Sequence, residues 1–275
     1  MSTIKRVAAV HDLSCFGRCS LAVILPVLSA MGVQCCPIPT AVLSSHTGGY
    51  DLIARTDLTG QMEGALSQWR GMNLTFDGVY TGYMASAEQI RLAADIIKGL
   101  KREGGIAVVD PVLGDHGRLY SSITSSMVDA MRELCRHADV ITPNLTEANL
   151  LLGREPGAPA HDPAAMAEAL SDGGRRSVVI TGVSPCEGQV GALWFDRDSG
   201  KVEAFAGQRV DAAYPGTGDL FTSVLTGVLV RGESLDQGAR QAVEFVRLCA
   251  AHTLERGLPT REGVEFEPLL GRLVP

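Results

Sequence analysis

Short apolar runs, each separated from the next by a helical pattern, recur along most of this chain. The runs at residues 7–10, 106–109 and 178–181 are apolar over nearly all of their length, which is typical of strands buried on both faces. Amphipathic segments such as residues 87–100 and 125–135 lie between them. Repeated strand–helix units of this kind predict a parallel, doubly wound sheet with helices on both faces.

The remaining elements complete this prediction. The pattern places further helices at residues 20–30, 58–69, 163–170 and 239–254, and further strands at 40–43, 78–81 and 140–142. We also expect a hairpin at the edge of the sheet, formed by residues 189–195 and 201–206. No low-complexity linker divides the sequence, so we expect one domain over residues 1–275.

Composition and charge limit the kinds of partner. The 275 residues are 45% hydrophobic and 20% charged, as in ordinary globular proteins. A net charge of -7 argues against nucleic-acid and anionic-membrane partners. Seven cysteines without paired C-x-x-C spacing indicate reduced thiols, and no signal peptide or membrane anchor is evident, so we expect a cytoplasmic enzyme.

A glycine-rich turn comes directly before the helical pattern that starts near Leu220. Gly216 and Gly218 would leave backbone N–H groups free at the positive end of the helix, which suits an anion. A carboxylate at Asp219 is electrostatically unfavourable in such a place unless it takes a proton from a substrate hydroxyl. On this local spacing alone, an ordinary helix cap explains the turn about equally well.

Polar residues also follow the other expected strands. Ligands of open α/β sheets bind at the carboxyl ends of the strands, so these residues form one candidate site. Asp110, Asp115 and Glu147 offer hard oxygen ligands that suit Mg²⁺ shared with phosphate. Each alone has an ordinary explanation as a loop, turn or first-turn acid. The other strand-end residues are His11, Asp12, Ser44, Ser45, His46, Thr47, Gly82, Tyr83, Thr142, Asn144 and Thr181.

Several motifs carry a resemblance to a known family. Residues 215–219, Pro-Gly-Thr-Gly-Asp, resemble the C-terminal signature of the ribokinase/PfkB superfamily, and residues 142–147 resemble its TPN-x-x-E segment. Residues 110–115 resemble the D-P-V-x-G-D segment of its vitamin-kinase branch. Residues 44–48 and 81–83 are similar to the substrate-side loops of pyridoxal kinases.

This resemblance extends from about residue 7 to about residue 254 and implies both a fold and an activity. The fold would be a ribokinase-like three-layer α/β/α sandwich with a mostly parallel central sheet and an edge hairpin. The activity would be transfer of phosphate from ATP, with Mg²⁺, to the 5′-hydroxymethyl group of a B6 vitamer (pyridoxal, pyridoxamine or pyridoxine). A monovalent cation such as K⁺ and a homodimer are further implications.

The resemblance also implies roles for individual residues. Asp219 would be the base, and the N–H groups of Gly216, Thr217 and Gly218 would hold the γ-phosphate. Asp115 and Glu147 would organise Mg²⁺. The residues expected beside the metal, the phosphates and adenine are Asp110, Thr142, Asn144, Thr181 and Val210. Those expected beside the pyridine ring are Asp12, His46, Thr47 and Tyr83.

Asp12 departs from the family pattern, because many pyridoxal kinases have Ser at the corresponding place. Two interpretations stay open. The carboxylate could accept a hydrogen bond from the 3-hydroxyl or a protonated nitrogen of the substrate, which would favour pyridoxamine over pyridoxal. It could instead bond the loop that follows it.

Two other functions compete with this one. The first is a kinase for hydroxymethylpyrimidine or a sugar-like alcohol on the same fold, which the segment 46–48 and Tyr83 disfavour. The second is a vitamer-binding protein without catalysis, which the intact segment 216–219 and the acidic residues disfavour. No Walker P-loop occurs in the sequence, so a nucleotide site of that type is not expected.

Overall fold

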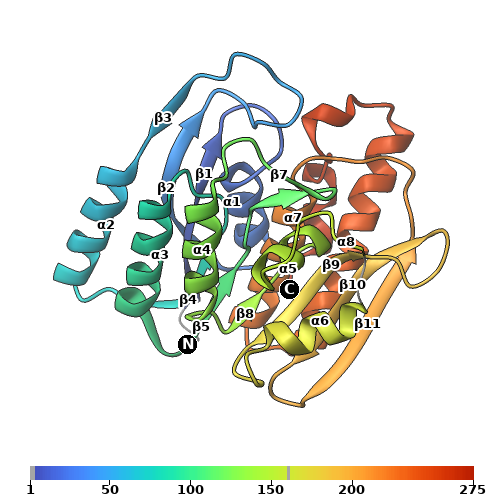
Figure 1. The fold of residues 1–275 in the computed structure, drawn as a ribbon. Coiled ribbons are helices and arrows are strands. Elements are labelled where there is room, and N and C mark those ends of the chain that lie inside the picture. Colours follow the sequence, from blue (N-terminus) through green and yellow to red (C-terminus); the bar gives the residue numbers. More distant parts are fainter. Residues whose placement is uncertain (1–3, 160–161) are drawn as a thin grey trace.

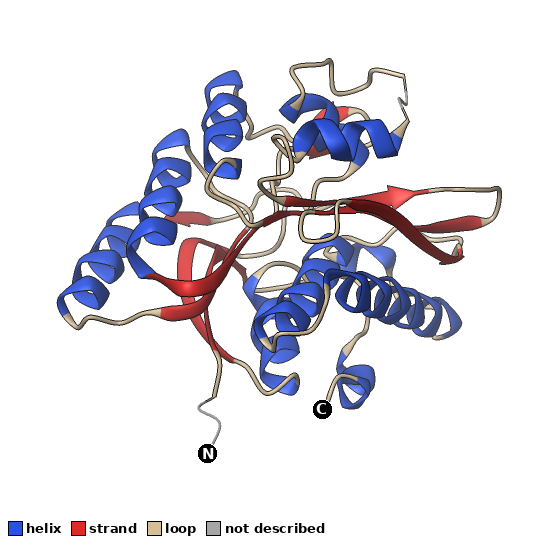
Figure 2. Ribbon diagram, turned by 90° about the horizontal axis from the view of Figure 1, so that it is seen from below, coloured by secondary structure: helices blue, strands red, loops and turns tan. Residues whose placement is uncertain are grey.

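The computed structural model describes residues 4–159 and 162–275, and within them a sheet of nine strands lies between two layers of helices (Figures 1 and 2). The strand order across the sheet is β11-β10-β9-β8-β5-β4-β1-β2-β3. Its strands are β1 (Arg6–Ser14), β2 (Gln34–Leu43), β3 (Arg55–Asp57), β4 (Phe76–Thr81), β5 (Lys101–Val109), β8 (Val140–Ile141), β9 (Ser177–Val183), β10 (Gln189–Asp196) and β11 (Lys201–Gln208).

Two short strands form a separate antiparallel ribbon. Most of the helices lie between consecutive strands along the chain. The ribbon consists of β6 (Gly114–Asp115) and β7 (Arg118–Leu119). The helices are α1 (Leu21–Ala30), α2 (Thr59–Gly71), α3 (Ala87–Leu100), α4 (Ser125–Cys135), α5 (Leu145–Leu151), α6 (Pro163–Leu170), α7 (Thr217–Val230) and α8 (Leu235–Glu255), followed by the 3₁₀ turns η1 (Thr260–Glu262) and η2 (Glu267–Arg272).

The prediction of a three-layer α/β/α sandwich with a mostly parallel sheet is confirmed. Strands β2, β1, β4, β5, β8 and β9 pair in parallel, as buried apolar runs joined by helices require. The expected hairpin is present, since β10 pairs antiparallel with both β9 and β11 at one edge. Figure 2 shows the sheet between its two groups of helices.

Alternation along each strand sends successive side chains into two separate cores. In β1, Val7 and Ala9 face the core formed with α1, α7 and α8, whereas Ala8 and Val10 face the core formed with α2 to α6. At the ends of β5 and β8, the same alternation places Asp110 and Thr142 on the side of the sheet that α7 covers.

Strands β1, β2 and β5 are all longer than the sequence pattern indicated. β2 begins at Gln34 rather than at Thr40 and runs through Pro37 and Pro39. Strand β3 pairs only with residues 41–43 of β2, so the part with the two prolines lies at the sheet edge, where a lacking N–H is tolerated. No helix among the described residues combines the length and apolarity that crossing a membrane would require.

Candidate active site

The glycine-rich turn begins α7. Gly216 is the N-cap residue with φ of 79°, a left-handed conformation, and a Cβ there would lie 1.9 Å from the carbonyl oxygen of Arg18. Both facts require glycine. The first N–H groups of a helix have no partner within it, and the Leu220 N–H is the first to bond back to the turn, at 2.9 Å from the Gly216 oxygen. The turn can therefore bind an anion.

Asp219 lies in the first turn of α7, beside these N–H groups. Its Oδ2 accepts a hydrogen bond from the Ser20 N–H at 2.8 Å, while Oδ1 has no hydrogen-bond partner in the described part of the chain. Burial raises the pKa of Asp219 to about 7, the Ser20 bond opposes this shift, and the charge of Asp12 adds to it. A carboxylate with a free oxygen and a pKa near neutrality suits general-base catalysis.

Asp12 lies behind this carboxylate and is only 2% exposed. Its Oδ1 accepts from the Ser20 hydroxyl at 2.5 Å, and its Oδ2 accepts from the Ser14 hydroxyl at 2.9 Å. Burial raises the pKa of Asp12, and the two serine bonds oppose the shift. These contacts match the interpretation that Asp12 bonds the loop that follows it. A contact with substrate stays a prediction.

Asp110, at the end of β5, brings a further carboxyl group close to Asp219. Burial raises its pKa well above the usual range, and the charges of Glu147 and Asp219 raise it further. None of these three carboxylates takes part in an ion pair with any residue that the structure describes. Neighbouring carboxylates without a compensating cation fit a bound divalent metal ion, and their hard oxygens suit Mg²⁺.

Glu147 and Asn144 close a capping box at the start of α5. Glu147 Oε2 accepts from the Asn144 N–H and Asn144 Oδ1 accepts from the Glu147 N–H, each at 2.9 Å. Glu147 Oε1 also accepts from the Leu113 N–H at 3.1 Å, and Asn144 Nδ2 donates to the Gly114 oxygen at 2.8 Å. Burial raises the pKa of Glu147 to about 8. The pair thus fixes the end of β8 to the segment after β5.

Asp115 lies further out than the other two proposed metal ligands. Its side chain is 47% exposed, and its Oδ1 accepts from the His116 N–H at 2.7 Å. Within residues 4–159 and 162–275, no three Asp, Glu, His or Cys side chains are arranged to hold a metal ion alone. Mg²⁺ usually keeps waters and substrate phosphates among its ligands, so one or two carboxylates here would suffice.

Thr142 and Thr181 also lie at this edge of the sheet. Thr142 is 3% exposed and accepts a hydrogen bond from the Thr222 hydroxyl of α7 at 3.1 Å. Thr181 donates its N–H to the Pro143 oxygen at 3.0 Å and forms a bridge with Asn144. Both threonines thus lie near the capping box. Val210 is half-buried and packs against the core of α1, α7 and α8.

The residues expected to contact substrate differ in exposure and in how many of their polar atoms already bond within the protein. His46 is buried: its Nδ1 accepts from the Gly48 N–H at 3.1 Å, so its Nε2 carries the proton and donates to the Arg261 oxygen at 2.6 Å. Thr47 is exposed. Tyr83 is half-buried and its hydroxyl donates to Ser122 Oγ at 3.3 Å. Thr47 and Tyr83 remain available to a ligand, whereas both nitrogens of His46 are used within the protein.

Two residues that the structure brings to this site, Ser20 and Tyr80, have no assignment from the sequence, whereas His11 is among the expected strand-end residues. Ser20 touches both Asp12 and Asp219, and in the sequence it looks like an ordinary helix cap. Tyr80 and His11 lie on the same side of the sheet, with ring centroids 4.3 Å apart. Within the described chain, the Tyr80 hydroxyl and both His11 nitrogens are buried without a hydrogen-bond partner. Burial lowers the pKa of His11 to about 3.

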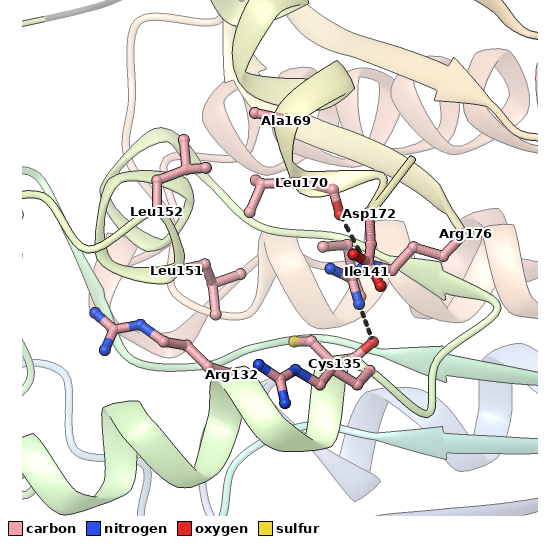
Figure 3. Close-up of a pocket in the computed structure, with 10 residues that line it drawn as sticks. Arg132, Cys135, Ile141, Leu151, Leu152, Ala169, Leu170, Asp172 and Arg176 are labelled. Carbon is pink, nitrogen blue, oxygen red and sulfur yellow. Dashed lines mark hydrogen bonds between the residues drawn. The ribbon is translucent and has the colours of Figure 1, made fainter. Parts of the chain in front are cut away.

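A cavity of about 220 Å³ lies elsewhere, among the C-terminal ends of α4, α5 and α6 (Figure 3). Two of its three arginines bond the last carbonyl groups of these helices: Arg132 donates to the Leu150 oxygen, and Arg176 donates to the Leu170 and Cys135 oxygens. Since these helices run opposite to the strands, the cavity lies away from the carboxyl edge of the sheet. We therefore do not assign it to the candidate active site.

Comparisons with known proteins agree with the fold and the motifs. A family model described as phosphomethylpyrimidine kinase matches residues 25–262. The pyridoxine/pyridoxal/pyridoxamine kinase of Bordetella avium is 34% identical over 279 residues, which cover 95% of this chain and 91% of that protein. The resemblance inferred from the motifs is confirmed.

Solved structures are similar over nearly the whole chain. A Bacteroides thetaiotaomicron protein, assigned provisionally as a phosphomethylpyrimidine kinase and crystallised in a form with pyridoxal, is 41% identical, with a TM-score of 0.92 over 98% of this chain and 96% of that one. Pyridoxal kinase from Lactobacillus plantarum is 34% identical, with a TM-score of 0.92 over 98% and 97% of the two chains. Pyridoxal kinase from Leishmania donovani, in complex with ADP and pyridoxamine, is 27% identical, with a TM-score of 0.82 over 98% and 95%.

Proposed function

The chain belongs to the phosphomethylpyrimidine kinase family, and we propose that it phosphorylates the 5′-hydroxymethyl group of a B6 vitamer with ATP. The relatives named above support pyridoxal, pyridoxamine and pyridoxine as the substrate class and ATP as the donor. The observation that carries the proposal is Asp219, which lies in the first turn of α7 and whose Oδ1 has no hydrogen-bond partner among the described residues.

In the proposed reaction, the substrate hydroxyl oxygen attacks the γ-phosphorus of ATP and the bond to the β-phosphate oxygen breaks. The hydroxyl proton passes to Asp219, and the products are the vitamer 5′-phosphate and ADP. The N–H groups of Gly216, Thr217 and Gly218 would hold the oxygens of the transferred phosphoryl group. Alignment and charge stabilisation, rather than covalent catalysis, account for most of the acceleration in such reactions.

We propose Mg²⁺ as the partner of ATP, because no cationic side chain among the described residues pairs with Asp110, Glu147 or Asp219. Asp110, Asp115 and Glu147 would hold it, in part through water. When bound, the ion would neutralise charge on the phosphates. Thr142 and Asn144, with Asp110, would lie beside the phosphates and a monovalent cation such as K⁺.

The remaining assignments concern substrate, nucleotide and assembly. We propose that Thr47 and Tyr83 contact the pyridine ring, that His46 shapes their loop, and that Asp12 lies behind the substrate pocket. Thr181 would touch ATP phosphate, and Val210 would line the adenine site. We further propose one domain over residues 1–275, a homodimer and a cytoplasmic location. The net charge of -7 supports the absence of nucleic-acid and membrane partners.

A direct phosphorylation assay tests the proposal. The purified protein is incubated with MgATP and, separately, with pyridoxal, pyridoxamine, pyridoxine, hydroxymethylpyrimidine or ribose, and the 5′-phosphate product is identified by mass spectrometry. We expect at least one B6 vitamer to have the highest kcat/KM. A higher kcat/KM for hydroxymethylpyrimidine would instead support the second candidate, which the family description favours. Tight vitamer binding without any product would support a binding protein and contradict both kinases.

A further inference from the structure

Ser20 starts α1 in an unusual way. A serine at the start of a helix commonly bonds the helix with its hydroxyl, but no such bond forms here. The Ser20 hydroxyl donates instead to Asp12 Oδ1 at 2.5 Å, and its N–H donates to Asp219 Oδ2 at 2.8 Å. One residue therefore joins two carboxylates, using its side chain for the first and its backbone for the second.

The backbone conformation of Ser20 is one that glycine favours. Its φ is 53° and its ψ is -135°, so an L-residue there is strained. The bond from its hydroxyl to Asp12 is buried, since Ser20 is 6% exposed and Asp12 is 2% exposed. This bond opposes relaxation of the backbone to a more ordinary conformation. A relaxed backbone would turn the Ser20 N–H away from Asp219.

The segment before Ser20 is fixed against the same turn that holds Asp219. The carbonyl oxygen of Arg18 lies where a Cβ of Gly216 would be, and the Arg18 N–H donates to the Glu262 oxygen at 3.0 Å. The Arg18 side chain donates to both oxygens of Glu267, at 2.7 and 3.0 Å. Helices α1 and α7 lie side by side (Figure 1). The segment and the turn therefore cannot move independently.

We propose that Ser20 is a positioning residue for the base: Asp12 anchors its hydroxyl, and its N–H holds Asp219 Oδ2 so that Oδ1 faces the substrate hydroxyl. The inference rests on the proposed kinase reaction. It gives Asp12 a part in catalysis that needs no contact with substrate. A base that is held less firmly slows the chemical step, whereas vitamer and ATP are bound mainly by other residues.

Three substitutions test this arrangement. Ser20→Ala removes the anchor but keeps the strained Cβ, and we expect kcat to fall by about 10-fold or more, with both KM values within about 3-fold of the parent. Ser20→Gly also lacks the hydroxyl but adopts the conformation without strain, so it should recover most of the lost kcat. Ser14→Ala removes the other hydroxyl bonded to Asp12 and leaves the Ser20–Asp219 bond intact. Its kcat should stay within about 2-fold of the parent.

The outcomes separate this inference from the proposed function. A parent protein that phosphorylates none of the alcohols overturns the proposed function, and this inference with it. An active parent with an unchanged kcat in Ser20→Ala overturns this inference alone. Equal losses of kcat in Ser20→Ala and Ser20→Gly also overturn it, because the effect would then not arise from backbone conformation. If Ser20 acts only through Asp219, then Ser20→Ala should not lower the residual kcat of the Asp219→Asn variant any further. A further loss of about 10-fold in the double variant would contradict the inference. This comparison remains valid even if Ser20→Ala alone is poorly stable.

Discussion

Asp219 and Glu147 each lie in the first turn of a helix, α7 and α5, and differ in how many of their carboxyl oxygens are bonded within the protein. Burial raises the pKa of both carboxyl groups, to about 7 and about 8. Both oxygens of Glu147 accept backbone N–H groups, those of Leu113 and Asn144. Asp219 has one oxygen so engaged and one free among the described residues. The comparison teaches that a raised pKa alone does not identify a catalytic acid or base.

The two groups also contribute differently to the fold. Glu147 closes the capping box of α5 and stabilises the protein itself. Asp219 is held by Ser20, the N-cap residue of α1, and its other oxygen has no hydrogen-bond partner in the described part of the chain. Substitution should therefore affect mainly activity at Asp219 and mainly stability at Glu147.

Asp219→Asn should produce the largest effect. The amide cannot accept the hydroxyl proton, so we expect kcat to fall by about 10²–10⁴-fold while ATP affinity stays near that of the parent. Steady-state kinetics and calorimetric titration with ATP measure these two quantities. Asp236→Asn is a matched control, because Asp236 lies in the first turn of α8 and pairs with Arg240. Less than a 10-fold loss of kcat would contradict the role of Asp219 as the base.

The pH dependence of kcat/KM should follow the ionisation of Asp219. Asp219 must be ionised to accept a proton, so kcat/KM should fall as the pH drops below about 7, approaching 10-fold per pH unit. A pH–rate profile between pH 5 and 9 measures this. A profile that is flat down to pH 5 would exclude a base with this pKa.

Glu147→Gln should change stability more than it changes the chemical step. One of its two backbone bonds is lost, because the amide nitrogen cannot accept an N–H, so the free energy of unfolding should fall by about 1–3 kcal/mol. Urea denaturation measures the change, with exposed Glu133→Gln as the control. If Glu147 also helps to hold Mg²⁺, the Mg²⁺ concentration for half-maximal rate should rise. An unchanged unfolding free energy would contradict the structural role.

Stability without ligands should depend on pH in the opposite sense to activity. In the folded state the pKa values of Asp219 and Glu147 are raised from 3.8 to about 7 and from 4.5 to about 8. At a pH between the ordinary and the raised value of each group, the folded state therefore binds more protons than the unfolded state. Their contribution is therefore most stabilising below about pH 4, and it is lost as the pH rises to about 8. Thermal melting in the absence of ATP measures this, and Asp219→Asn should weaken the dependence below pH 7. An identical dependence in this variant would contradict the raised pKa of Asp219.

Asn144→Ala should have the smallest effect. Loss of the helix cap should lower the free energy of unfolding by about 1 kcal/mol. Ser86→Ala removes a comparable cap, that of α3, where the Ser86 hydroxyl accepts from the Gln89 N–H. Both variants should be destabilised similarly, but only Asn144→Ala should also lower kcat, by about 3-fold or less. Equal kcat values in the two variants would argue that Asn144 has no part in the site.

The sequence predicted the fold well where strands are buried on both faces. Residues 106–109 and 178–181 lie within β5 and β9 as expected, because a continuous apolar run has few alternatives there. Edge elements were harder to predict. β3 is exposed along its length, and the prolines of β2 obscured a strand that pairs with a single neighbour over that part.

The sequence predicted only part of the candidate site, because a sequence pattern locates strand ends but not backbone conformations or long-range contacts. Strand ends bring Asp110 and Thr142 to one edge, which the topology rule anticipates. The role inferred for Ser20 depends on its N–H and on an uncommon backbone conformation, neither of which a residue type reveals. The bond between His46 and Arg261 joins residues 215 positions apart, and no local pattern encodes it.

The contacts of Arg18 with Glu262 and Glu267 have a consequence for the order of assembly during synthesis. A growing chain contains Ser20, Asp12 and later Asp219 before η1 and η2 leave the ribosome. The segment at Arg18 then lacks the backbone and ion-pair contacts that η1 and η2 supply. These contacts span about nine-tenths of the chain, so closing them comes after the local helices have formed. The carboxyl edge of the sheet is thus completed last, when the final turns dock.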